Sequence, residues 1–195
     1  MSNKEHPIAN VGVGIAEGGV GNPKSEIRNP KSKRGRLSHL NRDGSARMVD
    51  VTEKAETKRR AKARGKIAFS SDESWEALKQ GQTKKGDVLT VAKIGGIGAA
   101  KSTGALIPLC HPLSLTGIEV TFSLDDPGRT VLIESEVHCT GKTGVEMEAL
   151  TAVAVAALTI YDMCKAIDKG MVISGIRLIE KVGGRSGRWT FDGSG

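Results

Sequence analysis

The chain has 195 residues, of which 38% are hydrophobic and 26% are charged, a balance typical of one soluble globular domain and not of a disordered or fibrous protein. The formal net charge is +7, but residues 1–47 hold nine Lys and Arg against four Asp and Glu, so most of that charge lies outside the main body. The body lacks the basic stripe with interleaved aromatic residues that nucleic-acid surfaces use, and we therefore do not expect nucleic acid as a partner.

The cysteine count and the hydropathy pattern both indicate a cytoplasmic protein. Three cysteines are too few, and odd in number, for a disulfide framework, so reduced thiols are expected. The most apolar uncharged stretch, residues 149–161, has 13 residues, whereas a membrane-spanning helix needs about 20. The N-terminus also lacks the apolar segment of a secretory signal. We expect no association with a membrane.

Residues 1–36 are predicted to form a disordered basic tail. Gly and Asn are frequent there, a four-residue Asn-Pro-Lys-Ser repeat occurs twice, and residues 33–36 are basic. Such a segment cannot bury enough apolar surface to offset the entropy lost on ordering. An RNA-binding or targeting role for this tail is the alternative from another functional class. Residues 37–195 are predicted to be a single domain.

The first elements of the body are predicted from charge and capping signals. The charged run 53–64 is interpreted as a solvated helix. A second, short helix is expected to begin with Ser70 and Glu73 as a capping box and to stop at Gly81. Residues 88–101 fit either a helix or a strand.

The second half of the body has clearer periodicity. Alternating apolar residues over 118–124 and 131–137, joined by an Asp-Asp-Pro-Gly turn, predict an antiparallel hairpin. Residues 145–168 predict a long helix that is apolar on nearly every side and is therefore expected to be buried all round. A strand over 172–182 and a flexible basic segment over 183–188 follow. Together these elements predict an α+β fold, with helices on one face of an antiparallel sheet.

Two motifs resemble known binding sites but fit them poorly. Residues 95–102 match a phosphate-binding P-loop except at Ala100, where the motif requires glycine, so a nucleotide hydrolase stays a minor alternative. Cys110-His111 and His138-Cys139 resemble metal ligands, but neighbouring residues on a strand point to opposite faces. We expect no metal site.

Five side chains emerge as candidates for chemistry, three of them before or near the start of the long helix. His111 lies in a stiff segment between two prolines, where a fixed imidazole suits hydrogen bonding or proton transfer, although filling a loop is an equal alternative. Glu146 fits a capping box with Thr143 and has a purely structural alternative. Glu148 enters an apolar helix, and a buried carboxylate needs either a partner or a function.

Asp162 and Lys165 are three residues apart near the other end of the same helix. They fit a structural ion pair, or an acid/base pair in which a half-buried lysine is tuned toward a neutral pKa. Glu148 and Asp162 share a helical face but lie about 21 Å apart along the axis. One small substrate cannot easily touch both within one chain, so we expect an oligomer with sites at the interface.

Seven motifs spread along the body match one known family. They are residues 48–51, 54–57, 85–87, 99–101, 107–113, 140–151 and 158–166. In these motifs the chain resembles the MoaC-type cyclic pyranopterin monophosphate synthases of molybdenum cofactor biosynthesis, over roughly residues 37–189. The resemblance implies a single ferredoxin-like α+β catalytic domain that assembles as a hexamer, a trimer of dimers, with sites between subunits.

The resemblance also implies a reaction and a set of site residues. The reaction is that of a lyase, which converts (8S)-3′,8-cyclo-7,8-dihydroguanosine 5′-triphosphate to cyclic pyranopterin monophosphate and diphosphate without a cofactor. Implied catalytic residues are Asp162 and Lys165, assisted by Lys85 and His111. Implied substrate-binding residues are Leu109, Cys110, His111, Glu146, Met147 and Glu148, with Arg59, Lys101 and Lys181 on the triphosphate. Whether a divalent cation accompanies the triphosphate stays open.

Overall fold

The computed structural model describes residues 39–41, 43–81 and 86–193. The prediction of a disordered tail over residues 1–36 lies outside this range. The elements of the body in chain order are β1 Thr57–Ala68, α1 Asp72–Lys79, α2 Val88–Leu106, β2 Leu115–Asp125, β3 Thr130–Gly141, α3 Glu146–Cys164, β4 Val172–Val182 and β5 Trp189–Thr190.

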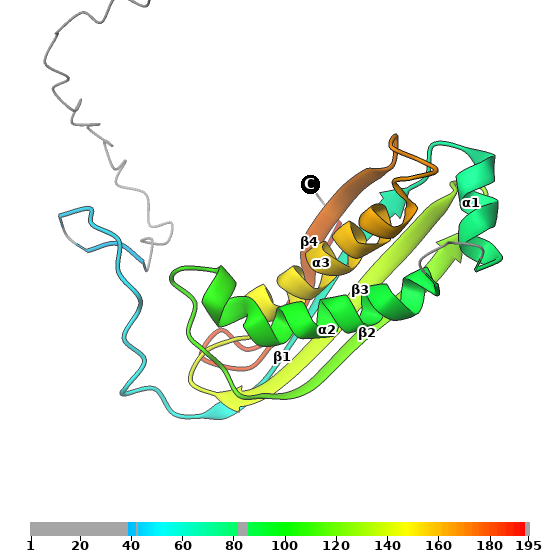
Figure 1. Ribbon diagram of the computed structural model, residues 1–195. Helices are drawn as coiled ribbons and strands as arrows, with labels where there is room; N and C mark the ends of the chain where they lie inside the picture. The colour runs from blue at the N-terminus through cyan, green and yellow to red at the C-terminus, as the bar shows by residue number, and fades with distance from the viewer. Residues whose placement is uncertain (1–38, 42, 82–85, 194–195) are drawn as a thin grey trace, which may run out of the picture. The chain divides into compact units, whose positions relative to one another are not determined.

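The strands form one antiparallel sheet in the order β2-β3-β1-β4-β5. α2 and α3 pack side by side against one face of this sheet, α3 over β1, β3 and β4, and α2 over β2 (Figure 1). Leaving aside the short α1 and β5, the succession β-α-β-β-α-β with β1 between β3 and β4 is the ferredoxin-like arrangement. The predicted fold class is confirmed, as are the hairpin and the strand over 172–182.

The prediction of a helix over residues 53–64 is wrong, because β1 occupies most of that run. On one face of β1, Ala61 and Ile67 are fully buried against the helices. On the other face the charged residues find partners on the neighbouring strands, as Lys62 does with Glu136 at 2.6 Å. A run that looks uniformly charged is thus an alternating strand whose charges are paired across the sheet.

The two helices after β1 begin at clear polar caps. The N-cap residue of α1 is Ser71 and not Ser70, and the Ser71 side chain accepts from the backbone amide of Ser74. Asp87 caps α2 by accepting from the backbone amides of Leu89 and Thr90, and residues 88–106 form a helix and not a strand. The P-loop-like stretch 95–102 lies inside α2, so its amides serve the helix and cannot cradle a phosphate.

The long helix α3 lies at the centre of the core, although it is not buried on every side. Ala149, Ala152, Ala156 and Ile160 are fully buried, whereas Leu158 is 58% exposed. By length and composition alone α3 would pass as a membrane span, but half of the qualifying stretch is buried within the domain. This is the pattern of a core helix with one free stripe.

Candidate active site

One end of the sheet gathers three loops and two adjoining cavities. The segment before β1, the α2–β2 connection and the start of α3 all lie at this end (Figure 1). The smaller cavity, of about 230 Å³, is called the inner cavity and is lined by His39, Leu109, Cys110, His111, Leu113, Thr143, Gly144, Glu146, Met147 and Glu148. The larger, of about 690 Å³, is called the cation cavity and is lined by Glu53, Lys54, Ala55, Thr57, Arg59, Lys142, Thr143, Gly144, Glu146, Lys181, Gly184, Arg185 and Ser186. The two share Thr143, Gly144 and Glu146 as lining residues.

The inner cavity brings together all six side chains that were predicted to hold the organic part of a substrate, from Leu109 to His111 and from Glu146 to Glu148. Glu148 is only 4% exposed. Burial raises the pKa of Glu148, and the nearby negative charge of Glu146 adds to the effect. A carboxyl group that holds its proton to higher pH can donate as well as accept a hydrogen bond in this cavity.

Cys110 lines the same cavity but is not an activated nucleophile. Burial, followed by the negative charge of Glu148, raises the pKa of the Cys110 thiol. The thiolate is the reactive form of cysteine, so this environment keeps Cys110 protonated and suits a packing or hydrogen-bonding role.

His111 is tied to the segment before β1. Its Nε2 lies 2.8 Å from the carbonyl oxygen of Val49. Because a carbonyl can only accept, Nε2 must carry a proton, which leaves Nδ1 as the lone-pair nitrogen of the neutral ring. His111 is therefore held in one tautomer and one orientation.

The cation cavity holds Arg59 and Lys181, both predicted to bind phosphates. The Arg59 guanidinium donates to the carbonyls of Gly141 and Lys142 at 3.3 and 3.4 Å. Lys181 forms an ion pair of 3.2 Å with Glu146. The capping-box alternative for Glu146 is wrong, because the N-cap residue of α3, Val145, makes no side-chain cap bond. The Glu146 carboxylate contacts Lys181 instead.

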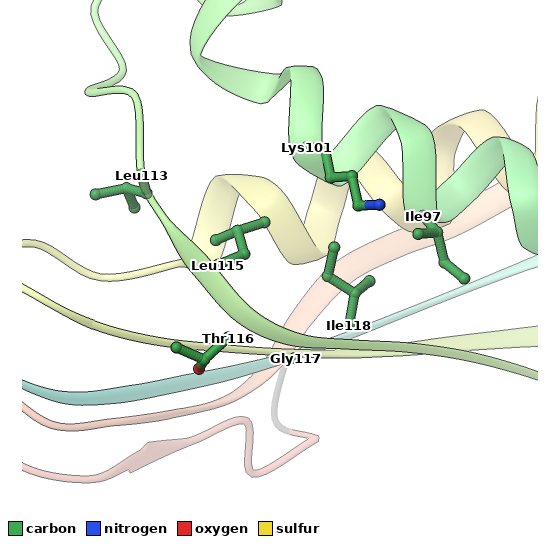
Figure 2. Close-up of a pocket in the computed structure, with 7 residues that line it drawn as sticks. All are labelled: Ile97, Lys101, Leu113, Leu115, Thr116, Gly117 and Ile118. Carbon is green, nitrogen blue, oxygen red and sulfur yellow. The ribbon is translucent and has the colours of Figure 1, made fainter.

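Lys101, the third predicted phosphate-binding residue, is not brought to the cation cavity. It projects from α2 into a separate pocket of about 340 Å³ beside the start of β2, which is lined by Ile97, Leu113, Leu115, Thr116, Gly117 and Ile118 (Figure 2). Leu113 lines both this pocket and the inner cavity, so the two are neighbours.

The pair Asp162 and Lys165 lies at the far end of α3 and lines neither cavity. The Lys165 ammonium contacts the Asp162 carboxylate at 2.6 Å, and both side chains are more than half exposed. The hydrogen bond to Asp162 raises the pKa of Lys165, so the expectation of a half-buried lysine with a lowered pKa is wrong for the single chain. Lys85 lies outside the described residues.

Several cavity residues were missed by the sequence reasoning. Lys54, Lys142 and Arg185 add positive charge to the cation cavity, and His39 lines the inner cavity. Lys54 and Lys142 occur within the matched motifs, which was the available signal. In the part of the chain that the structure describes, no three His, Cys, Asp or Glu side chains form a group that could hold a metal ion.

Comparison with known proteins identifies the family of this chain. The model of the MoaC family matches residues 48–184. A cyclic pyranopterin monophosphate synthase of Heliobacterium modesticaldum is 61% identical over 153 residues, which cover 78% of this chain and 96% of the relative. Proteins with the same name from Desulfitobacterium hafniense and Thermoanaerobacter pseudethanolicus are 61% and 57% identical, with 93% and 95% of the relatives covered and 78% and 77% of this chain. This chain belongs to the MoaC family.

Proposed function

We propose that the chain is a cyclic pyranopterin monophosphate synthase. It converts (8S)-3′,8-cyclo-7,8-dihydroguanosine 5′-triphosphate to cyclic pyranopterin monophosphate and diphosphate, as a lyase of molybdenum cofactor biosynthesis. The observation that carries the proposal is the junction of the two cavities. The inner cavity, which holds a buried carboxyl group, shares Thr143, Gly144 and Glu146 with the cation cavity, which is rich in Lys and Arg. This arrangement fits a heterocycle joined to a triphosphate.

The substrates and products define what the site must do. A cyclic monophosphate and diphosphate arise from a triphosphate when a hydroxyl oxygen attacks the α-phosphorus and the bond to the β-phosphate oxygen breaks. The hydroxyl must lose a proton, and negative charge accumulates on the departing diphosphate. Arg59 and Lys181 would bind the phosphates and stabilise that charge, since forked guanidinium and compact ammonium donors both suit phosphate oxygens.

The heterocycle rearrangement requires further proton transfers. We assign these to Asp162 and Lys165, with Lys85 and His111 assisting. For His111 the locked tautomer leaves Nδ1 as the nitrogen able to take a proton. Leu109, Cys110, Met147 and Glu148 would position the ring system in the inner cavity, and Glu146 would position Lys181.

The assignment of Asp162 and Lys165 needs a second subunit. Both lie at the opposite end of α3 from the two cavities, so a neighbouring chain would supply them across an interface. This agrees with the proposed hexamer, a trimer of dimers, and with the exposed Leu158 on α3. Lys101, in its own pocket beside the inner cavity, would reach the triphosphate in such an assembly. We also propose that the protein acts in the cytoplasm.

The test is turnover of authentic cyclised dihydro-GTP by the purified protein, with cyclic pyranopterin monophosphate and diphosphate both quantified. Equal amounts of the two products are expected. GTP is the matched control, because it carries the same triphosphate without the cyclised ring and should give no diphosphate. Release of diphosphate or phosphate from GTP alone would contradict the proposal and favour a nucleotide hydrolase.

A further inference from the structure

The segment just before β1 runs along both cavities without belonging to the sheet. Residues 48–55, here called the strap, contain no helix or strand. At one end the Val49 carbonyl contacts His111 of the inner cavity. At the other end Glu53, Lys54 and Ala55 line the cation cavity. A substrate that fills both cavities must therefore pass the strap or lie beneath it.

Two side chains from other parts of the fold hold the strap in place. His111, from the α2–β2 connection, donates to the Val49 carbonyl at 2.8 Å. Lys142, which follows β3, donates to the Thr52 carbonyl at 2.7 Å. Among the described residues, local contacts such as the bond from the Thr52 amide to the Asp50 carboxylate add to these, and the positive charge of Lys142 also attracts the Asp50 carboxylate. Most strap side chains are exposed, so packing contributes little and the two anchors dominate.

The Lys142 ammonium can change its hydrogen-bond acceptor, whereas the bond from His111 to the strap is kept. Protonation of His111 leaves the hydrogen on Nε2, so the bond to Val49 survives in either charge state. Lys142, in contrast, is a lining residue of the cation cavity, and its ammonium donates to the Thr52 carbonyl. Anionic phosphate oxygens that enter this cavity are stronger acceptors than a neutral carbonyl.

We infer that Lys142 is a positioning residue that holds the strap across the site, and that phosphate entering the cation cavity competes with the Thr52 carbonyl for its ammonium group. The inference deepens the proposed function, because it describes how the same site admits the triphosphate and releases diphosphate. The strap loosens when the Lys142 ammonium leaves the Thr52 carbonyl and binds phosphate.

Hydrogen exchange of the strap amides in the free protein tests this without any substrate. In Lys142→Met the amides of residues 52–54 should exchange about tenfold faster, the effect of losing one charge-assisted hydrogen bond. Lys142→Arg should stay within about threefold of wild type, because a guanidinium also donates to a carbonyl. Lys66→Met is the matched control and should not change hydrogen exchange in the strap. Lys66 is an exposed lysine on the face of the sheet that the helices do not cover. Lys142→Gln replaces Lys142→Met if that variant does not fold.

Inorganic diphosphate then tests the competition. Adding it to the wild-type protein should accelerate exchange at residues 52–54, while in Lys142→Met it should cause no further acceleration. Unchanged exchange in Lys142→Met, or diphosphate that slows strap exchange in the wild type, would overturn the inference. Because the first experiment involves no turnover, failure of the proposed reaction and failure of this inference give different results.

Discussion

Glu148 and Asp162 lie on the same helix, 14 residues apart, one near each end of α3. This spacing corresponds to about 21 Å along the helix axis. Glu148 is buried beside the inner cavity, whereas Asp162 is exposed at the far end. If both act on one substrate, they must come from different subunits.

Mixing two inactive variants tests this relationship directly. Asp162→Asn should lower kcat by about a hundredfold or more, the usual range for a lost acid/base group. Glu148→Gln alters a group that positions the ring system, and misplacement of a substrate also costs about a hundredfold. When the two are unfolded together and reassembled, about a quarter of the sites should recover, because random pairing across a two-fold interface gives some sites both intact residues. The readout is product formation per total chain.

The control for the mixing experiment is reassembly of each variant with itself, which should restore no activity. Size-exclusion chromatography must show that both variants keep the wild-type oligomeric state. If the mixture stays inactive although mixed oligomers form, the two residues act within one chain or Asp162 does not serve this site.

The buried carboxyl group of Glu148 predicts a pH-dependent cost to stability. Burial raises the pKa of Glu148, so the folded protein holds this proton to higher pH than the unfolded chain does. Stability therefore falls as pH rises from the ordinary carboxyl pKa of about 4.3 to the raised value, and the cost is complete above it. Glu148→Gln carries no charge, so its melting temperature should exceed that of the wild type increasingly as pH rises. A difference that is the same at every pH would contradict this.

The lowered pKa of Asp168 predicts that its contribution to stability changes with pH in the opposite direction. Burial alone would raise the pKa of Asp168, but hydrogen bonds from Ser70, Ser74 and Gly170 outweigh it, and the pKa is lowered. The stability it contributes is present above pH of about 4 and is lost as pH falls through the lowered pKa. Asp168→Asn should cost about 1.5–3 kcal/mol in urea unfolding at neutral pH. Glu119→Gln on an exposed strand position is the control and should be near neutral.

Two glycines of α2 form a matched pair for helix packing. A Cβ added at Gly96 would lie 2.9 Å from the backbone oxygen of Ala152 on α3, whereas a Cβ at Gly98 would meet nothing within 4 Å. Gly96→Ala should therefore destabilise the protein by about 1–3 kcal/mol through overpacking. Gly98→Ala should stabilise it by about 0.5–1 kcal/mol through helix propensity. Similar unfolding midpoints for the two variants would mean that the helices separate easily.

Local patterns in the sequence were sufficient for much of the fold and for the family. The alternating runs of β2 and β3, with Pro127 and Gly128 in the turn, depend on neighbours in sequence and were predicted correctly. The apolar composition of α3 likewise identified a core helix, and with it the buried position of Glu148. Such features are readable because each residue's environment follows from the period of its own element.

The tertiary structure alone decided the features that depend on partners far along the chain. From its sequence alone β1 was predicted to be a charged helix. In the folded chain Glu136 on β3 pairs with Lys62, and Glu180 on β4 pairs with Arg60. Lys101 and Lys181 look equivalent in sequence, yet only Lys181 lies in the cation cavity. The strap is bonded to His111 and to Lys142, and Lys142 is 90 residues from its partner Thr52. Ion pairs and side-chain anchors between distant residues leave no periodic signal, because folding and not sequence proximity brings their atoms together.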